Sequence, residues 1–143
     1  MTFVIDASVA FKWFVSDEED AEAAAALLRT ESTLIAPDIL VAEVSNTLWR
    51  SVRIGRIPLK QAVQGTVAVS TLFEVLVGSA ALAPRALAIA RALDHPVYDC
   101  LYLTLAEARQ ARLVTADMRF LTKLNRTAWE QSALPLAQYS AGA

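Results

Sequence analysis

Short apolar runs alternate with segments of helical character along this chain, and this alternation constrains the fold more than any other feature. The runs that predict strands are residues 2–5, 33–36 and 113–115, with 134–136 as a last short strand. Strands that alternate with helices indicate an α/β fold with a mainly parallel sheet and helices on both faces. Ligands of such sheets bind beyond the carboxyl ends of the strands, so the residues that follow each run are the first candidates for a site.

The expected helices occupy the segments between these runs. Residues 16–19 read Ser-Asp-Glu-Glu, which is a capping-box pattern. This pattern predicts a helix that begins there and ends near residue 29. Pro37 ends the second strand, and a helix is expected from Asp38 to about residue 52, with Gly55 just past its end. Further helices are expected over residues 7–14, 58–72, 84–93, 97–111 and 117–125, whereas 73–77 fits a strand or a helix end.

The composition limits the class of protein and the kind of metal site. The chain is 55% hydrophobic and 20% charged, which suits one domain over residues 1–143. Its longest uncharged stretches, 61–73 and 131–143, are shorter than the roughly 18–20 residues of a membrane-spanning helix, so no membrane contact is expected. Residues 1–20 lack the basic start of a signal peptide. One cysteine fits a reducing cytoplasm, and one histidine with one cysteine supplies no zinc set.

Two acidic residues follow predicted strands. Asp6 directly follows the first run, and Asp117 follows residues 113–115 after one alanine. Both side chains project at the same rim of a parallel sheet if these strands are neighbours. Each aspartate is also explained by the simpler role of a helix N-cap, for which Asp is generally preferred.

Two further acids lie on predicted helices. Asp99 stands in the first turn of an otherwise apolar helix, where the helix dipole alone favours an acid but where little polar surface surrounds it. Glu43 shares one helix face with Asn46, Arg50 and Arg53, because the spacings are i, i+3, i+7 and i+10. This stripe is either a solvated face or the border of a groove, with Glu43 facing a metal ion and the two arginines lying along a phosphate backbone.

A cluster of all four acids requires a cation. Two carboxylates about 4 Å apart repel each other by roughly 4 kcal/mol at an effective dielectric constant of 20. Oxygen ligands without a histidine or cysteine set select Mg²⁺ or Mn²⁺. Such an ion can activate a water molecule and stabilise the charge on a scissile phosphate. The net charge of −2 gives no overall attraction to nucleic acid, but local basic clusters permit a polyanion partner.

Four motifs follow one another along the chain. They are residues 4–8 (Val-Ile-Asp-Ala-Ser), residues 37–48 around Glu43, Tyr98-Asp99, and residues 113–117 (Leu-Val-Thr-Ala-Asp). In this order they resemble the PIN-domain ribonucleases, and most of all the VapC-type toxins of toxin–antitoxin pairs. The resemblance covers nearly the whole chain. It implies a three-layer α/β/α fold, Mg²⁺- or Mn²⁺-dependent cleavage of RNA, a homodimer, and a small antitoxin that covers the active groove.

The resemblance also implies roles for individual residues. The family's acidic positions correspond to Asp6, Glu43, Asp99 and Asp117. Asp6 and Asp99 are expected to be the main metal ligands. Ser8 and Thr115 match its hydroxyl positions and would hold carboxylates or water molecules. Arg50 and Arg53 are candidate RNA contacts.

Two other functions stay open on the sequence alone. A carboxylate–Mg²⁺ phosphohydrolase acting on a small phosphate ester would use the same acids, although a haloacid-dehalogenase pattern needs Asp-x-Asp where residues 6–8 read Asp-Ala-Ser. A PIN-like scaffold that binds RNA or protein without turnover is the other, and the mutual repulsion of four acids argues against it.

The remaining notable side chains have simpler interpretations. His95, just before Pro96, is expected at the surface or as a helix C-cap. Cys100 is expected to be a small buried residue. Large aromatic residues are expected first of all in the core, with some in a dimer face: Trp13, Trp49, Trp129, Phe11, Phe14, Phe73 and Phe120.

Overall fold

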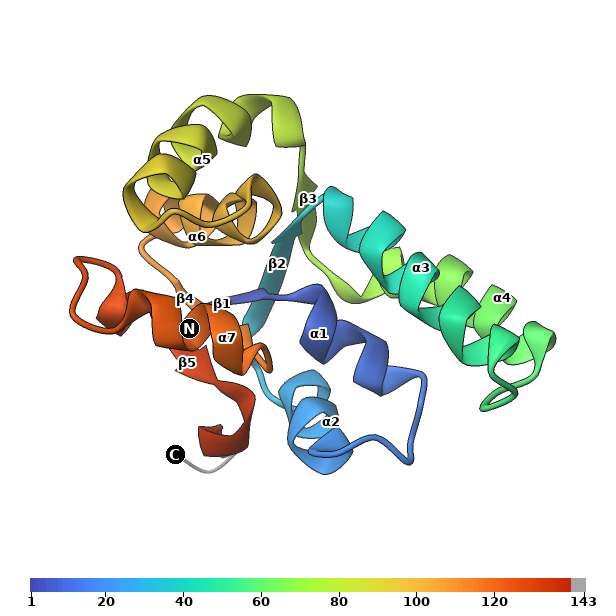
Figure 1. Cartoon of the computed structure of the whole chain (residues 1–143). Coiled ribbons are helices and arrows are strands. Elements are labelled where there is room, and N and C mark those ends of the chain that lie inside the picture. Colours follow the sequence, from blue (N-terminus) through green and yellow to red (C-terminus); the bar gives the residue numbers. More distant parts are fainter. Residues whose placement is uncertain (140–143) are drawn as a thin grey trace.

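The computed structural model describes residues 1–139, which form a five-stranded parallel sheet flanked by helices (Figure 1). The strand order is β3-β2-β1-β4-β5, and every neighbouring pair is parallel. The strands are β1 Thr2–Ile5, β2 Thr33–Pro37, β3 Val75–Val77, β4 Arg112–Thr115 and β5 Ala133–Pro135. The α/β class and the parallel sheet expected from the sequence are therefore confirmed, and segment 73–77 provides a strand.

Helices cover the sheet on both sides. The α-helices are α1 Ala7–Ala10, α2 Ala21–Arg29, α3 Ile39–Arg53, α4 Leu59–Ala68, α5 Ser79–Leu93, α6 Val97–Arg109 and α7 Met118–Leu124. Short 3₁₀ turns are η1 Phe11–Trp13, η2 Val69–Leu72, η3 Glu130–Ser132 and η4 Leu136–Gln138. Helix α6 packs against β1, β2 and β4 and is covered by α5, whereas α1 and α2 lie on the other side and the α3–α4 hairpin projects outward (Figure 1).

The core is built around β1, β4 and α6. The side chains of α6 from Cys100 to Ala106 are buried without interruption, since this helix lies between the sheet and α5. That position explains its nearly continuous apolar sequence, which a surface helix would not have. The two polar side chains of this segment, Tyr102 and Thr104, each donate a hydrogen bond from the hydroxyl group.

Helix α2 begins later than the capping-box pattern predicts, so that prediction was wrong. The helix starts at Ala21, and Asp20 before it has a φ of 59°. The acids of residues 16–19 serve a different purpose: Arg56 Nη2 donates to Asp17 Oδ1 at 3.0 Å and to Glu18 Oε2 at 3.2 Å. These ion pairs hold the acidic loop against the end of α3 instead of capping α2.

Helix α5 begins five residues before the predicted start at Pro84. Its first residue, Ser79, donates to Asp38 Oδ1 from both the backbone nitrogen at 3.1 Å and the hydroxyl group at 2.6 Å. This anchor at the end of β2 fixes the helix start. Pro84 then lies inside the helix, where its missing N–H costs one hydrogen bond near the first turns.

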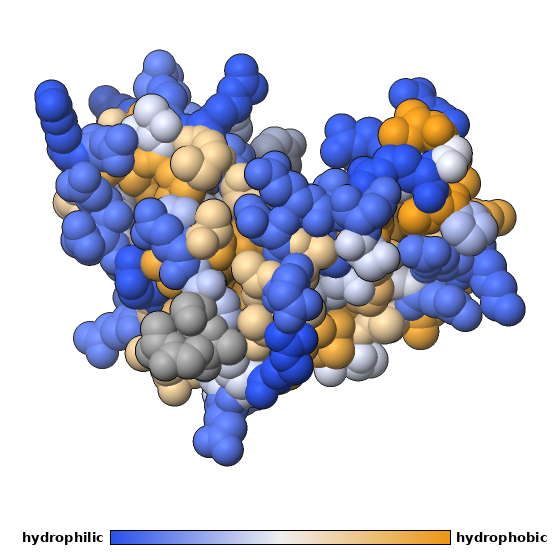
Figure 2. Space-filling model, turned by 90° about the horizontal axis from the view of Figure 1, so that it is seen from below, coloured by the Kyte–Doolittle hydropathy of each residue, from blue (hydrophilic) through white to orange (hydrophobic). Residues whose placement is uncertain are grey.

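The α3–α4 hairpin carries apolar residues on its surface. Trp49, expected in the core, is 54% exposed, because the buried stripe of α3 runs through Leu40, Val44 and Leu48 and Trp49 lies off that stripe. The space-filling view shows apolar and strongly hydrophilic residues side by side on this projecting arm (Figure 2). The other exposed apolar residues of the hairpin are Ile54, Leu59, Val63 and Val67. Among residues 1–139, no helix combines the length and the apolar character needed to cross a membrane.

Candidate active site

The ends of β1 and β4 bring two predicted acids to one rim of the sheet. These strands are neighbours, with Ile5 paired to Val114, and the backbone nitrogen of Asp6 donates to Val114 O at 3.1 Å. Asp117 lies just beyond the end of β4. From β1 to β3 the strands are added on one side of β1, and the chain then crosses over to β4 on its other side. The strand order therefore changes direction between β1 and β4, and ligands of parallel sheets bind at such a point.

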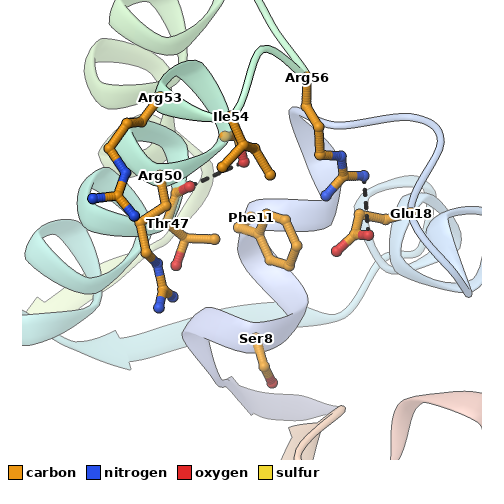
Figure 3. A pocket seen from close by; sticks show the side chains of 9 residues that line it. Ser8, Phe11, Glu18, Thr47, Arg50, Arg53, Ile54 and Arg56 are labelled. Atoms are coloured by element: carbon orange, nitrogen blue, oxygen red, sulfur yellow. Dashed lines mark hydrogen bonds and ion pairs between the residues drawn. The ribbon is translucent and has the colours of Figure 1, made fainter.

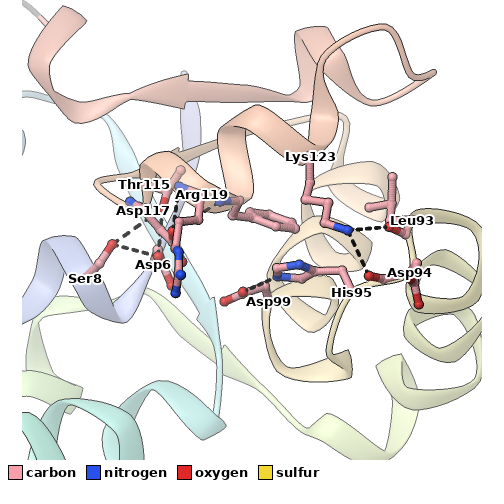
Figure 4. Close-up of polar contacts among 11 residues, drawn as sticks. Asp6, Ser8, Leu93, Asp94, His95, Asp99, Thr115, Asp117, Arg119 and Lys123 are labelled. Atoms are coloured by element: carbon pink, nitrogen blue, oxygen red, sulfur yellow. Dashed lines mark hydrogen bonds and ion pairs between the residues drawn. The ribbon is translucent and has the colours of Figure 1, made fainter.

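All four acids that the sequence singled out line one cavity of about 240 Å³. Glu43 reaches it from the first turns of α3 and Asp99 from the first turn of α6. In Figure 4 the Asp99 carboxylate points from α6 toward the end of β1, where Asp6 lies. The rest of the lining consists of Ala7, Ser8, Asn46, Thr47 and Arg50. Residues that are up to 111 positions apart in the sequence therefore share one small polar space.

Asp6 is the most buried of the four, with 7% of the residue exposed. Its Oδ2 accepts hydrogen bonds from Ser8 Oγ and Thr115 Oγ1, both at 2.7 Å. Burial raises the pKa of Asp6 from 3.8 to about 6; the two hydroxyl bonds lower it, and the charges of Asp99 and Glu43 raise it. Although Asp6 stands at the N-cap position of α1, its side chain makes no capping bond there within the described residues.

Asp117 does serve as the N-cap that the simpler interpretation assigns to it. Its Oδ1 accepts from the backbone nitrogens of Arg119 at 3.0 Å and Phe120 at 3.1 Å, at the start of α7. Its own backbone nitrogen donates to Thr115 Oγ1 at 3.0 Å. Capping fixes this carboxylate at the cavity wall, so the structural role and a place in the site are compatible.

Glu43 has a partner that the sequence analysis missed. The hydroxyl group of Tyr102 donates to Glu43 Oε1 at 2.6 Å, and Tyr102 is 1% exposed. Burial raises the pKa of Glu43, the Tyr102 bond lowers it, and the charge of Asp99 raises it. The available signal was position: Tyr102 lies three residues after Asp99 and therefore on the same side of α6.

His95 caps the end of α5, as expected, through its backbone nitrogen, which donates to Ala90 O at 3.0 Å, but its side chain contacts Asp99, so the expected surface position was wrong. His95 Nε2 lies 2.6 Å from Asp99 Oδ2, and the histidine side chain is only 13% exposed. The imidazole packs on the ring of Phe120, with 4.8 Å between ring centroids. The preceding loop is fixed by Lys123 Nζ, which donates to the carbonyl oxygens of Leu93 and Asp94 (Figure 4). The i, i+4 spacing of His95 and Asp99 was the signal in the sequence.

Each of the four carboxylates is held by one oxygen and has no hydrogen bond on the other within the described part of the chain. The second oxygens are Asp6 Oδ1, Glu43 Oε2, Asp99 Oδ1 and Asp117 Oδ2. Every fully buried side-chain oxygen or nitrogen of residues 1–139 has a hydrogen-bond partner. The free oxygen of Asp6 therefore reaches open space.

The donor set fits a hard divalent cation. It consists of carboxylate oxygens, which are the ligands that Mg²⁺ and Mn²⁺ prefer. Within residues 1–139, no three His, Cys, Asp or Glu side chains stand as a ready-made cluster around one metal position. The acids line the walls of the cavity, and a cation would be held by free oxygens that turn toward its centre.

A second cavity adjoins the first. It measures about 490 Å³ and shares Ser8, Thr47 and Arg50 with the acidic cavity. Figure 3 shows the ring of Phe11 in its middle, with Arg50 and Arg53 on one side and the Arg56–Glu18 pair on the other. We call it the Phe11 cavity. Both candidate RNA contacts of the sequence analysis line the Phe11 cavity, and Arg50 also lines the cavity of the four acids.

Comparison with known proteins assigns this fold and site to a class. Residues 3–125 match the PIN domain family, and the chain therefore belongs to that family. The chain is 30% identical over 125 residues to the protein named Ribonuclease VapC3 of Pyrobaculum aerophilum, which is 86% of this chain and 95% of that protein. The resemblance to VapC-type PIN domains is thereby confirmed.

Two solved structures share the fold. PAE2754 from Pyrobaculum aerophilum has a TM-score of 0.69 at 24% identity, covering 96% of this chain and 90% of its own. VapBC2 from Rickettsia felis, bound to a DNA fragment from its promoter, has a TM-score of 0.63 at 13% identity, covering 94% and 98%. At these identities the likeness concerns the fold, and it confirms the three-layer α/β/α arrangement.

Proposed function

We propose that this chain is a metal-dependent endoribonuclease, the toxin of a toxin–antitoxin pair, which hydrolyses RNA phosphodiesters. The observation that carries the proposal is the gathering of Asp6, Glu43, Asp99 and Asp117 around one cavity beyond the carboxyl ends of β1 and β4. Its 30% identity to a protein named as a ribonuclease supports the same activity. The chain would act as a single nuclease domain over residues 1–143 in the cytoplasm.

The proposed cofactor is Mg²⁺, with Mn²⁺ as a substitute. Asp6 and Asp99 would be the main ligands, and Glu43 and Asp117 would complete the set directly or through water. When bound, the ion supplies an activated water molecule and offsets negative charge on the phosphate that reacts. Below a pH of about 6, a proton on Asp6 would compete with the cation, because burial raises the pKa of this carboxyl group.

The protein's own contribution is to orient the carboxylates. Ser8 and Thr115 hold Asp6, and Tyr102 holds Glu43. His95 holds Asp99, and the first backbone N–H groups of α7 hold Asp117. Partners of this kind fix the direction of a ligand, and their loss typically weakens metal affinity or activity by about 10–100-fold.

The proposed RNA path runs from the acids along α3. Arg50 and Arg53 lie one turn apart on this helix and border the Phe11 cavity. Their guanidinium groups would bind successive phosphates on one side of the scissile bond. The proposal also includes a homodimer and a small antitoxin, in keeping with the likeness to VapBC2, which is solved with its promoter DNA.

Cleavage of total RNA tests the proposal. The purified protein in Mn²⁺ should cut RNA at sites that can be mapped, and Asp99→Asn should abolish the cuts. Asp94→Asn is the matched control, because this neighbouring acid is exposed, does not line the cavity, and has the left-handed backbone that Asn also tolerates. Asp6→Asn should behave like Asp99→Asn while the protein stays folded.

A generic phosphomonoester, tested in parallel, separates the rival functions. Hydrolysis of the phosphomonoester with intact RNA would replace the proposal with a small-molecule phosphohydrolase. RNA cleavage that persists in both Asp→Asn variants would refute the assignment of these acids. Metal-independent RNA binding without any hydrolysis would make the protein a binding scaffold.

A further inference from the structure

The Phe11 cavity has the size and the lining of a site for one nucleotide. Its volume of about 490 Å³ lies in the range of small-ligand sites, about 300–1,000 Å³. Phe11 is half-buried, and its ring stands between α3 and the acidic loop (Figure 3). The sequence analysis assigned this ring first to the core, yet part of it faces the open space. An aromatic ring in a cationic groove is what single-stranded nucleic acid uses for base stacking.

The Phe11 ring is partly buried and packs against the core. Lys12 Nζ lies 5.6 Å from the ring centroid and donates to Glu19 O at 2.7 Å, which ties η1 to the acidic loop. The ring also lines the cavity, so part of its surface is left for a planar partner. A ring held in place loses little conformational freedom when a base stacks on it.

The arginines that line the Phe11 cavity differ in whether they already form an ion pair. Arg56 is paired with Asp17 and Glu18. Arg50 makes no ion pair with any residue of the described chain, and it borders both the Phe11 cavity and the acidic cavity. Its guanidinium is thus placed between a nucleotide in the Phe11 cavity and the reacting phosphate in the acidic cavity, where it can bind a phosphate oxygen.

Glu18 gives the cavity a hydrogen-bond acceptor. Arg56 holds its Oε2, whereas its Oε1 has no hydrogen bond within residues 1–139, and the side chain is 23% exposed. An ionised carboxylate only accepts hydrogen bonds. It can accept from the exocyclic amino group of adenine, cytosine or guanine, whereas uracil offers it only the ring N3–H.

We propose that the Phe11 cavity binds the nucleotide adjacent to the scissile phosphate of single-stranded RNA. The base stacks on Phe11, its amino group donates to Glu18, and its phosphate meets Arg50. This inference rests on the proposed ribonuclease function, and it adds a preference for an amino-bearing base at one position.

Binding of labelled eight-residue oligoribonucleotides tests the inference without requiring cleavage. Fluorescence anisotropy in EDTA at one fixed salt concentration compares oligoadenylate, oligocytidylate, oligouridylate and an abasic ribose-phosphate oligomer. The wild-type protein should bind the adenylate and cytidylate about five-fold or more tightly than the abasic oligomer, from the lower end of base–aromatic stacking energies. Both should also bind more tightly than oligouridylate.

Three variants separate stacking from general binding. Phe11→Leu should reduce the affinity for oligoadenylate to the level of the abasic oligomer, and Phe11→Tyr should restore it. Glu18→Gln should remove the preference for adenylate and cytidylate over uridylate. Tyr139→Leu is the matched control, because this aromatic residue packs against Phe3 at the opposite end of β1 and should leave every affinity unchanged. Thermal melting verifies that each variant is folded.

The outcomes distinguish this inference from the proposed function. RNA cleavage by the wild type with unchanged base preference in Phe11→Leu overturns the nucleotide site and leaves the ribonuclease intact. A Phe11-dependent preference without cleavage supports the site and overturns the hydrolase. Equal affinity of the wild type for all four oligomers overturns the inference.

Discussion

Asp6 is a carboxylate that the fold buries at the end of β1, where it contacts two hydroxyl groups and faces two other acids. Burial disfavours its charged form, and the Ser8 and Thr115 bonds offset only part of that penalty. Such an arrangement stores electrostatic free energy that a bound cation would release. The residue therefore connects the stability of the metal-free protein to its proposed chemistry.

Asp6→Asn should stabilise the metal-free protein at pH 8. The folded-state pKa of about 6 lies above the ordinary 3.8, so the native state binds the proton more tightly and its stability falls as the pH rises from about 4 through about 6. The gain of the variant should reach about 3 kcal/mol above this window and vanish near pH 4. Denaturant unfolding in EDTA at several pH values measures it, and a gain that is independent of pH would contradict the assignment.

Tyr102→Phe should weaken the site while the fold persists. Loss of the hydroxyl group frees Glu43 Oε1 and removes the bond that lowers the pKa of Glu43. Mn²⁺ affinity should fall by about 10–100-fold, as for other partners of metal ligands, with a loss of about 1 kcal/mol in stability. Tyr98→Phe is the control, because Tyr98 is 62% exposed. Equal Mn²⁺ affinity in the two variants would show that Tyr102 has only a packing role.

At this scale, sequence reasoning found the acids and, through the family resemblance, the two hydroxyl residues that contact Asp6, but it missed the partners of Glu43 and Asp99. Asp6 and Asp117 are predictable because they follow strands, and the rule for ligand position in parallel sheets applies to them. The contact of Glu43 with Tyr102 joins α3 to α6 across 59 positions, which local spacing does not determine. The contact of Asp99 with His95 has the local i, i+4 signal, but the direction of the His95 side chain does not follow from that spacing alone. Trp49 shows the same difficulty: it directly follows Leu48, which belongs to the buried stripe of α3, and yet Trp49 lies at the surface.

Among the elements, α3 carries the largest share of the site. Its buried side packs through Leu40, Val44 and Leu48, and this packing directs Glu43 and Arg50 toward the cavities. Helix α4 supports α3 from outside. The two helices approach closely at Gly65, where an added Cβ would lie 2.8 Å from Leu48 Cδ1 and 3.3 Å from Phe14 Cγ.

Gly65→Val should destabilise the protein through this contact. The larger side chain must displace Leu48, which is fully buried, and the ring of Phe14, so the expected loss is about 1–3 kcal/mol. Gly78→Ala is the matched control: an added Cβ at Gly78 meets nothing within 4 Å, and its φ of −59° suits alanine. Denaturant midpoints compare the two. Equal midpoints would show that the hairpin does not pack as described.

Element boundaries were predictable where local signals act alone. Helix α3 and strand β4 agree with the sequence to within a residue or two, because Pro37, Gly55 and the apolar run mark their ends. The starts of α2 and α5 depend instead on distant partners. Arg56 engages the acids of the apparent capping box, and Asp38 anchors α5 ahead of Pro84. Local patterns do not contain these long-range bonds.

For the whole molecule, the parallel sheet places an acidic cavity beside a basic one, although the net charge is only −2. Arg50 stands where the two meet. Nucleic-acid binding by such a protein depends on local cations and not on total charge, so its strength should vary with salt according to the number of phosphates contacted.

Arg50→Ala should weaken RNA binding nearly uniformly across sequences. Loss of one phosphate contact should also reduce the slope of log affinity against log salt by about 0.7, the value for single strands. Arg91→Ala on the exposed face of α5 is the control, since this arginine lines neither cavity. Anisotropy titrations at several salt concentrations provide the slopes. An unchanged slope in Arg50→Ala would remove this residue from the RNA path.

The most direct measurement of the central claim is Mn²⁺ uptake by the purified protein, followed by electron paramagnetic resonance of the free ion. We predict saturable uptake by the wild type at pH 8, an unchanged curve for Asp94→Asn, and affinity at least ten-fold weaker for Asp99→Asn. The wild type should also melt at a higher temperature as Mn²⁺ is added. Uptake that never saturates, or that is equal in all three proteins, would show that the four acids do not form a metal site.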